Sequence, residues 1–138
     1  MGQVKLRWVE KRQFVGTDSS KHSVVLSSQD PENGTGMRPA ELLLVALGGC
    51  AAYDVVGIME KKRQPLAGLE LHITGEQDTA PPWAFNQIHV EYVAYGEGIS
   101  ETALAQAIKL SEEQYCSVSA TLSGVAEITS SYRINPAS

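Results

Sequence analysis

The chain has 138 residues, 43% of them hydrophobic, and a formal net charge of −5 at pH 7. This length is close to the commonest size of a single domain, so the sequence predicts one domain, residues 1–138, with one hydrophobic core. The acidic balance and the scattered basic residues argue against nucleic acid as a partner, because phosphate binding needs clustered Lys and Arg side chains.

The pattern of residues 4–28 predicts strands. Apolar side chains alternate along the first of them, and a turn at Gly16-Thr17-Asp18 precedes a second alternating run at Val24 and Leu26. We expect an antiparallel meander.

The first residues lack the unbroken apolar stretch of a secretory signal, so we expect a cytoplasmic protein. The longest apolar run, Leu42 to Cys50, has nine residues, two of them glycines. Because a helix needs about 20 residues to span a bilayer, we expect no membrane insertion.

A long helix is predicted after a loop at residues 29–36, which is rich in turn-forming residues. Pro39 fits the first turn of a helix, and helical character continues to about Arg63, before Pro65. Apolar residues cover nearly the whole circumference of this helix, which is typical of a helix surrounded by protein. One chain of this size can hardly enclose it, so we predict a two-fold symmetric homodimer.

Strands and helices alternate in the rest of the chain. The pattern predicts strands at 69–73 and 88–92, a helix at 101–114 capped by Ser100, a break at 115–117, a short helix at 118–122 and a closing strand at 125–134. We therefore assign the chain to the α+β class.

The two cysteines, Cys50 and Cys116, are the expected reactive centre, since stable disulfides are uncommon in a reducing compartment. Cys50 follows Gly48 and Gly49 in the middle of the long helix, where each glycine costs about 1 kcal/mol relative to alanine. Either another backbone segment packs very closely there, or space is kept beside the sulfur for a ligand. A small, inert, buried thiol is the alternative to a reactive one.

Cys116 stands where the short helix is expected to begin. The helix dipole favours a thiolate at that position, which predicts a lowered pKa; an inert thiol at a helix junction is the alternative. The separation of the cysteines by 66 positions excludes a CxxC redox motif and a zinc knuckle. With no phosphate-binding glycine loop, Ser nucleophile elbow or HExxH motif either, the sequence predicts no cofactor and no metal.

A rotation of about 100° per residue places Asp54 near the line of Cys50 on the helix and Glu41 on the opposite side. Glu41 is therefore a poor partner for the thiol. Asp54 either pairs with a cation, caps a neighbouring element, or stays unpaired and raises the pKa of Cys50. An unpaired Asp54 requires a positive group near the thiol. The candidates are Arg38, Arg12 and Arg7.

Two segments together resemble the OsmC/Ohr family of proteins similar to osmotically inducible protein C. The first runs from Arg38 to Cys50, RPAELLLVALGGC, and the second is Tyr115-Cys116-Ser117-Val118. The helix from proline to cysteine, the cysteine spacing and the order of strands and helices match over nearly the whole chain. Residues 50–56 and 61–63 look most like the YhfA-like branch of the family.

The resemblance implies an OsmC-like fold, in which antiparallel sheets wrap around long central helices in an intertwined homodimer. In the peroxidase members, the helix cysteine attacks an organic hydroperoxide or hydrogen peroxide and becomes a sulfenic acid. The second cysteine resolves it as a disulfide, and a dithiol reduces that disulfide. Carried over, Cys50 is peroxidatic and Cys116 is resolving, which agrees with thiol chemistry.

One position departs from the peroxidase pattern. In those members a glutamate directly follows the helix-opening proline and pairs with an arginine that it holds over the thiolate; here Ala40 follows Pro39. Glu41 is one residue out of register, about 100° around the helix. Arg38 remains a candidate for the positive charge near the thiol, without the glutamate that holds the arginine in the peroxidases.

Three hypotheses follow. The first is a thiol-dependent redox enzyme, a weak or differently tuned peroxidase of organic hydroperoxides. The second is a non-catalytic module that binds a small apolar or electrophilic ligand beside Cys50, which Ala40 and the glycines favour. The third is a structural dimer with buried thiols.

Overall fold

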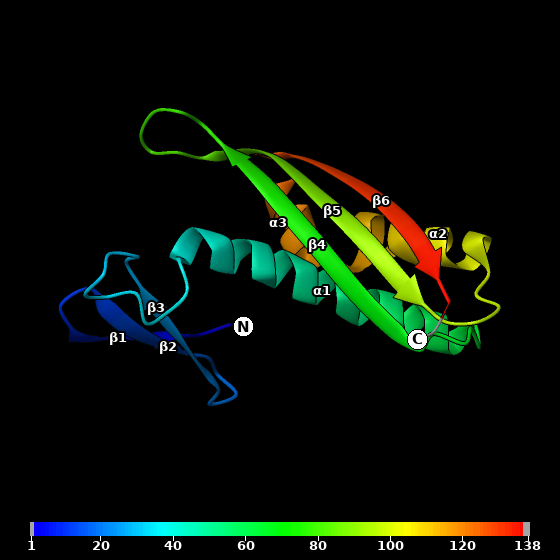
Figure 1. Cartoon of the computed structure of the whole chain (residues 1–138), viewed down its shortest axis with the longest axis horizontal. Helices are drawn as coiled ribbons and strands as arrows, with labels where there is room; N and C mark the ends of the chain where they lie inside the picture. Colours follow the sequence, from blue (N-terminus) through cyan, green and yellow to red (C-terminus); the bar gives the residue numbers. More distant parts are fainter. Residues whose placement is uncertain (1, 137–138) are drawn as a thin grey trace. The chain divides into compact units, whose positions relative to one another are not determined.

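A computed structural model describes residues 2–136 of the chain. Its elements follow the order β1, β2, β3, α1, β4, β5, α2, η1, α3, β6, where η1 is a π-helix (Figure 1). Contacts within the chain divide it into two compact units, one ending at Leu43 and the other beginning at Leu44. Each unit has its own sheet, and the mixture of elements confirms the predicted α+β class.

The N-terminal unit carries the predicted antiparallel meander, in the order β1-β2-β3. The strands are β1 (Lys5–Glu10), β2 (Gln13–Thr17) and β3 (Ser23–Ser27). The turn predicted at Gly16 is misplaced, because Gly16 and Thr17 still pair with β3. It begins at Asp18, whose Oδ1 accepts the N–H groups of Ser20 and His22, each at 3.0 Å.

Helix α1 (Pro39–Lys61) begins at the predicted proline and ends two residues before the predicted Arg63. Arg63 adopts a φ of 55°, the left-handed backbone that commonly terminates helices. The buried residues of α1 recur three or four positions apart and form one stripe. They are Leu47, Gly48, Ala51, Val55 and Met59. Other apolar side chains of the helix are exposed in the single chain, including Val45, Tyr53 and Val56.

By length and composition alone, α1 is long and apolar enough to cross a membrane, with a mean hydropathy of 2.0 in its most apolar window. The expectation based on the unbroken run from Leu42 to Cys50 missed this, because the apolar character continues past the two glycines to Met59. The core helix of a soluble protein passes the same test. The length and apolar composition of α1 are therefore only weak evidence that it spans a membrane.

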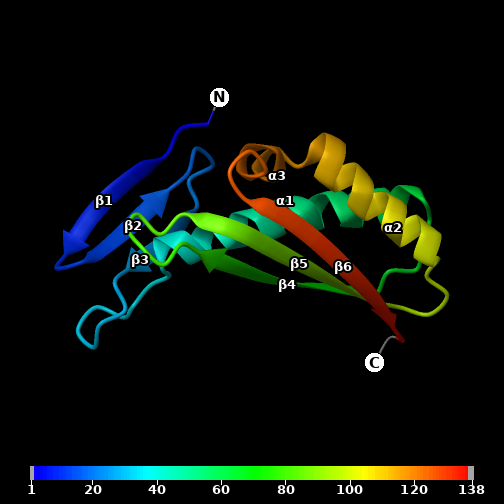
Figure 2. The same ribbon diagram turned by 90° about the horizontal axis from the view of Figure 1, so that it is seen from above.

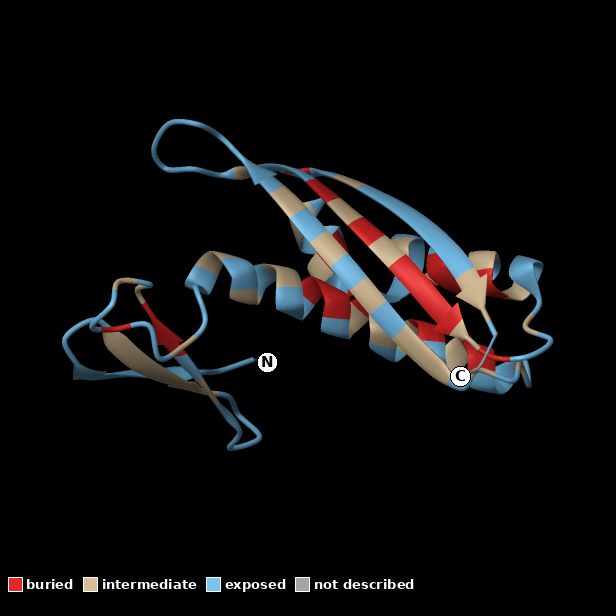
Figure 3. Cartoon of the chain, viewed as in Figure 1, coloured by how far each residue is buried: buried red, intermediate tan, exposed pale blue. Residues whose placement is uncertain are grey.

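The second unit contains the sheet β4-β5-β6. Its strands are β4 (Gly68–Gln77), β5 (Phe85–Tyr95) and β6 (Glu127–Asn135). β4 runs antiparallel to β5, whereas β6 pairs with β5 in parallel, so this sheet is mixed rather than purely antiparallel. The central strand β5 carries most of the buried residues of the sheet (Figure 3).

The segment that joins β5 to β6 crosses over one face of this sheet. It consists of α2 (Glu101–Leu110), η1 (Ser111–Tyr115) and α3 (Ser117–Leu122), which lie on the same side of the sheet as α1 (Figures 1 and 2). Ser100 caps α2 as predicted, since its side chain accepts the Ala103 N–H at 3.2 Å. The helix predicted to reach Gln114 ends instead at Leu110 and continues as the π-helix.

The core of the second unit lies between the sheet and the three helices. Its buried members come from α1, β5 and α2, together with Cys116 just before α3 and Ala126 just before β6. Among them, Val55, Met59 and Leu104 are 0% exposed, and Cys116 is 3% exposed. One of the two thiols is therefore part of the hydrophobic core.

We expect Val55→Ala to lower the free energy of unfolding by about 2 kcal/mol, because it removes two buried carbons and leaves a cavity. Val125→Ala removes the same atoms from a side chain that is 75% exposed and should change stability by less than about 0.5 kcal/mol. Urea unfolding followed by circular dichroism measures both. Equal losses would contradict this position of the core.

Candidate functional site

Cys50 is held in the middle of α1, and the two glycines before it have separate explanations. A Cβ atom on Gly48 would lie 2.5 Å from Cδ1 of Ile73 in β4, so Gly48 permits close packing of the helix on the sheet. A Cβ atom on Gly49 would meet nothing within 4 Å. Gly49 lines a hollow of about 1110 Å³ along α1. The sequence left close packing and open space as alternatives. The structure shows close packing at Gly48 and open space at Gly49.

Cys116 is placed by the end of the π-helix. Its N–H donates to the Ser111 carbonyl at 2.8 Å, and its extended backbone makes it the N-cap of α3. The Cys116 Sγ atom accepts the N–H of Ser119 at 3.3 Å. The sulfur is thereby fixed at the first turn of α3, as the sequence predicted.

The fold brings the two cysteines together although they lie 66 positions apart in the sequence. Both are free thiols. The Cys50 Sγ, the Cys116 Sγ and a carboxylate oxygen of Asp54 all lie within 4.8 Å of one another. No local motif in the sequence indicates this group, because its members come from α1 and from the distant start of α3.

The two thiols have pKa values shifted in opposite directions. Burial acts to raise the pKa of Cys50, but hydrogen bonds from the Cys116 thiol, the Val118 N–H and the Ser117 side chain outweigh it, and the pKa falls below the usual value. Burial raises the pKa of Cys116 to about 11, with a further contribution from its hydrogen bond to Cys50. Cys50 is the thiol poised to ionise.

The prediction that the helix dipole lowers the pKa of Cys116 is therefore wrong in direction. The Ser119 N–H does favour the Cys116 thiolate, but desolvation and the neighbouring Cys50 dominate. The amide of Val118, also in the first turn of α3, acts to lower the pKa of both thiols. The start of the helix thus favours both thiolates, but only at Cys50 does the pKa fall below its usual value.

Asp54 accepts a hydrogen bond from the Ser111 hydroxyl, which lies 2.9 Å from Oδ2. Asp54 therefore pairs with a neutral donor of η1, and its charge still acts to raise the pKa of Cys50. Ser111 is fully buried. The sequence places Asp54 on the Cys50 side of the helix but does not indicate Ser111, because its pattern predicts regular α-helix through residue 114.

Two further titratable groups, Glu112 in η1 and Tyr92 in β5, have shifted pKa values. Burial raises the pKa of Glu112, whose Oε1 is buried without a hydrogen-bond partner among residues 2–136. Burial, followed by the nearby charges of Glu112, Cys116 and Asp54, raises the pKa of Tyr92 well above its usual range. Sequence reasoning found neither Tyr92 nor Glu112, since only the fold brings β5 and η1 to the thiols.

Arg38 and Glu41 both belong to the N-terminal unit. Arg38 Nη1 donates to Glu41 Oε1 at 3.1 Å, and both side chains are more than half exposed. This pair agrees with the expectation that Glu41 is not the partner of the thiol. The roles of Arg38, Glu41 and Asp54 in supporting the chemistry of Cys50 stay predictions.

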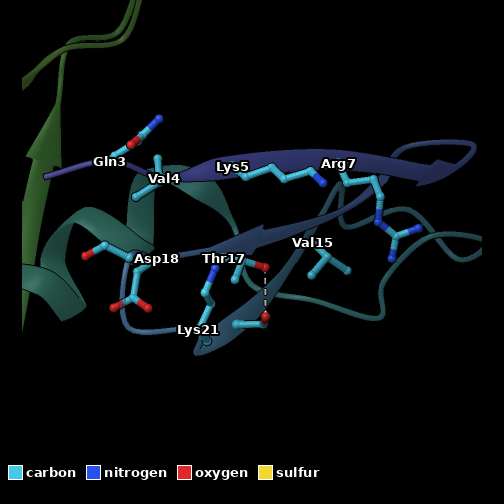
Figure 4. A pocket seen from close by; sticks show the side chains of 10 residues that line it. Gln3, Val4, Lys5, Arg7, Val15, Thr17, Asp18 and Lys21 are labelled. Atoms are coloured by element: carbon cyan, nitrogen blue, oxygen red, sulfur yellow. Dashed lines mark hydrogen bonds between the residues drawn. The ribbon is translucent and has the colours of Figure 1, made fainter.

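A separate hollow of about 640 Å³ lies in the N-terminal unit (Figure 4). Lys5, Arg7 and Lys21 line it together with Asp18, and a Thr17–Ser23 hydrogen bond of 2.8 Å closes one side. It contains neither cysteine, and its lining is exposed. The hollow therefore has no part in the thiol site.

The three histidines hydrogen-bond to polar neighbours at the surface. His72 Nε2 lies 3.2 Å from Glu70, and the two ring nitrogens of His89 lie 2.7 and 2.9 Å from Thr129 and Ser131. His22 lies in the turn that follows β2. None of these contacts involves a thiol.

Comparison with known proteins gives the same family from three directions. The family model described as OsmC-like protein matches residues 32–131. Protein YhfA of Escherichia coli strain K12 is 34% identical over 132 residues, which cover 96% of this chain and 97% of YhfA. The crystal structure of a hypothetical protein from Aquifex aeolicus VF5 is 30% identical, with a TM-score of 0.89 over 100% of this chain and 98% of its own.

More distant structures extend the likeness of fold. The crystal structure of the organic hydroperoxide resistance protein OhrB of Bacillus subtilis has a TM-score of 0.63 at 14% identity, over 96% of this chain and 98% of its own. At 14% identity, the similarity shows a shared fold and says nothing of a shared activity. The OsmC-like fold and the similarity to YhfA that the sequence predicted are confirmed.

We expect Cys50 to react with iodoacetamide at lower pH than Cys116, because the thiolate is the reacting form. The labelling of Cys50 should rise below the ordinary thiol pKa, and that of Cys116 only near its pKa of about 11. Asp54→Asn removes a charge that raises the pKa of Cys50, so its labelling curve should shift to still lower pH.

Mass spectrometry of the labelled peptides measures both curves. Asp78→Asn is a matched control, since Asp78 is exposed and accepts a hydrogen bond from Asn86 at 2.8 Å. It should leave both curves unchanged. Labelling of Cys116 before Cys50 would contradict the assignment.

Proposed function

The chain belongs to the OsmC family of OsmC-like proteins, and on that premise we propose that it is a thiol peroxidase that reduces organic hydroperoxides in the cytoplasm. Cys50 is the attacking thiol and Cys116 the resolving one. The observation that carries the proposal is the contact between two free thiols with opposite pKa shifts. The name of OhrB, an organic hydroperoxide resistance protein, supports the substrate class.

In the first step the Cys50 thiolate attacks one oxygen of the hydroperoxide. The O–O bond breaks, the departing alkoxide takes a proton to become an alcohol, and Cys50 becomes a sulfenic acid. The lowered pKa of Cys50 supplies the thiolate that this step needs.

In the second step the Cys116 sulfur attacks the Cys50 sulfur. A disulfide forms, and the departing hydroxide takes the Cys116 proton to leave as water. The raised pKa of Cys116 keeps that proton in place until it is needed. A dithiol reductant then returns both residues to thiols by exchange.

The activation of Cys50 differs from the peroxidase pattern that the sequence comparison describes. Ala40 replaces the family glutamate, and Arg38 pairs with Glu41. The donors that lower the pKa of Cys50 are neutral: a thiol, an amide N–H and a hydroxyl. A thiolate held by neutral donors alone is a reason to expect a slower peroxidase.

The hollow along α1 favours a second function, in which the chain binds a small apolar or electrophilic ligand without catalysis. Its volume is about 1110 Å³, and Gly49, Tyr53, Asp54 and Tyr115 are among the residues that line it. Most of the lining is apolar or aromatic, and the charged residues Asp54, Glu60, Lys61 and Lys62 also border it; such a mixture suits a small organic molecule. This function needs no disulfide.

We propose that a second copy of the chain covers the same side of α1 in a homodimer. Val45, Tyr53 and Val56 are 51%, 83% and 37% exposed, respectively, and Gly49 and Gly57 both have open space where a side chain would stand. Small and apolar residues four positions apart let two helices approach closely. A further copy with the same stripe fits this surface in a two-fold arrangement.

We expect reduced protein to consume cumene hydroperoxide with dihydrolipoamide as reductant and to form a Cys50–Cys116 disulfide. Cys50→Ser should abolish turnover. Cys116→Ser should stop after one equivalent of peroxide, with a sulfenic acid on Cys50 that a dimedone adduct reveals by mass spectrometry.

Absence of both peroxide consumption and the disulfide would overturn the peroxidase. In that case, a small molecule retained by Cys50→Ser in native mass spectra would favour the binding function. Alkylation of neither thiol in the folded protein would favour the structural alternative.

We expect Val56→Lys to weaken the homodimer, because it places a charge on the apolar side of α1. Size-exclusion chromatography with light scattering measures the mass over a dilution series. Thr102→Lys adds the same charge at an exposed position of α2 and should leave the mass unchanged. A monomeric parent protein would contradict the proposed dimer.

A further inference from the structure

We propose that the reduced protein binds one Zn²⁺ ion through the Cys50 Sγ, the Cys116 Sγ and the Asp54 carboxylate. The three donor atoms lie within 4.8 Å of one another. In a tetrahedral zinc site with Zn–S bonds of about 2.3 Å, two sulfurs stand about 3.8 Å apart. A sulfur and a carboxylate oxygen stand about 3.6 Å apart in such a site, so closing the gaps takes movements of up to about 1.2 Å, which rotation of the side chains can supply.

The supports of the three ligands are those of a metal site. The Ser111 hydroxyl binds Asp54 Oδ2 at 2.9 Å and leaves Oδ1 for an ion. The Cys116 sulfur accepts the Ser119 N–H at 3.3 Å. Ligands of metal ions are commonly oriented by such outer hydrogen bonds.

The charge of the surroundings favours a cation. Two thiolates and the Asp54 carboxylate carry three negative charges on donor atoms that lie within 4.8 Å of one another. A divalent ion removes most of this repulsion, and it lowers the pKa of each thiol that binds it.

The ligand set selects the metal. Two thiolates with one carboxylate suit Zn²⁺, which accepts sulfur and oxygen ligands together, whereas Mg²⁺ and Ca²⁺ take oxygen ligands only. Three protein ligands leave the fourth position of a tetrahedral ion for water, as in catalytic zinc sites.

Zinc and the disulfide exclude each other, because both use the same two sulfur atoms. When a hydroperoxide oxidises the zinc-bound form, the two thiolates give up two electrons and the hydroperoxide takes up two protons. The products are the disulfide, an alcohol, water and free Zn²⁺. Only this release step rests on the proposed peroxidase; binding to the reduced thiols does not.

The test uses the full chain, reduced with a phosphine, stripped with a chelator and kept without oxygen. We expect titration against a chromogenic zinc chelator to give one ion per chain. Co²⁺ in the same protein should show a thiolate-to-metal charge-transfer band and the visible bands of a tetrahedral site.

Variants identify the ligands. Loss of an outer partner commonly lowers metal affinity by about 10- to 100-fold, so Ser111→Ala should fall in that range and Asp54→Asn should lose at least as much. Cys50→Ser and Cys116→Ser should each remove part of the charge-transfer band. Asp78→Asn, the matched carboxylate control, should keep the parent affinity.

Circular dichroism of each variant separates loss of a ligand from loss of the fold; Asp54→Asn keeps the shape and can still accept the Ser111 hydrogen bond. Failure of the folded parent protein to bind zinc would overturn the inference. Equal affinities of Asp54→Asn and Asp78→Asn, or a Co²⁺ spectrum without a thiolate band, would overturn it too.

Addition of cumene hydroperoxide to the zinc-loaded protein should release one ion per disulfide formed. Zinc binding without peroxide consumption would reject the peroxidase and leave the metal site standing. Peroxide consumption by a protein that binds no zinc would support the peroxidase and overturn the metal site.

Discussion

The parallel pairing of β5 with β6 requires the intervening chain to cross back over the sheet, because two parallel strands cannot be joined by a tight turn. That crossover carries α2, η1 and α3 on the face that α1 also covers. This segment supplies Cys116, Ser117 and Val118, which lower the pKa of Cys50, and Ser111, which binds Asp54. The thiol site is therefore a product of sheet topology, and its second half could not stand opposite α1 if β6 returned antiparallel.

The sequence predicted the elements whose signals are local. The proline start of α1, the cap at Ser100 and the short helix after Cys116 agree with the structure within a few residues. Asp54 was placed on the correct side of α1 by helical periodicity. The missed features depend on distant segments: the parallel register of β6, the π-helix, and the partners Ser111 and Tyr92. The pKa of Cys116 was misjudged because the helix dipole could be read from the sequence, whereas the burial that outweighs it could not.

The two proposals place opposite demands on one cluster of groups. Peroxide reduction needs one thiolate and one thiol, so it benefits from pKa values that differ, as those of Cys50 and Cys116 do. Metal binding needs both sulfurs ionised and gains from Asp54, whose charge disfavours the lone Cys50 thiolate. The Asp54 carboxylate hinders peroxide reduction but assists metal binding, and metal binding thus accounts for its position beside the thiols. It also means that metal supply and peroxide level act on the same two atoms.

The π-helix η1 determines in which direction around the helix axis the residues that follow it point. A π-turn holds one more residue than a regular helical turn, and one residue corresponds to about 100° of rotation around a helix axis. Removing a single residue between Leu110 and Tyr115 would convert this stretch to ordinary α-helix and turn Cys116 away from Cys50 while leaving the sheet and α1 intact. A deletion of one codon could thus separate the thiols without unfolding the protein, and the reverse insertion could join them. Reactivity in this fold can be gained or lost over evolution by a change in chain length alone, with neither cysteine mutated.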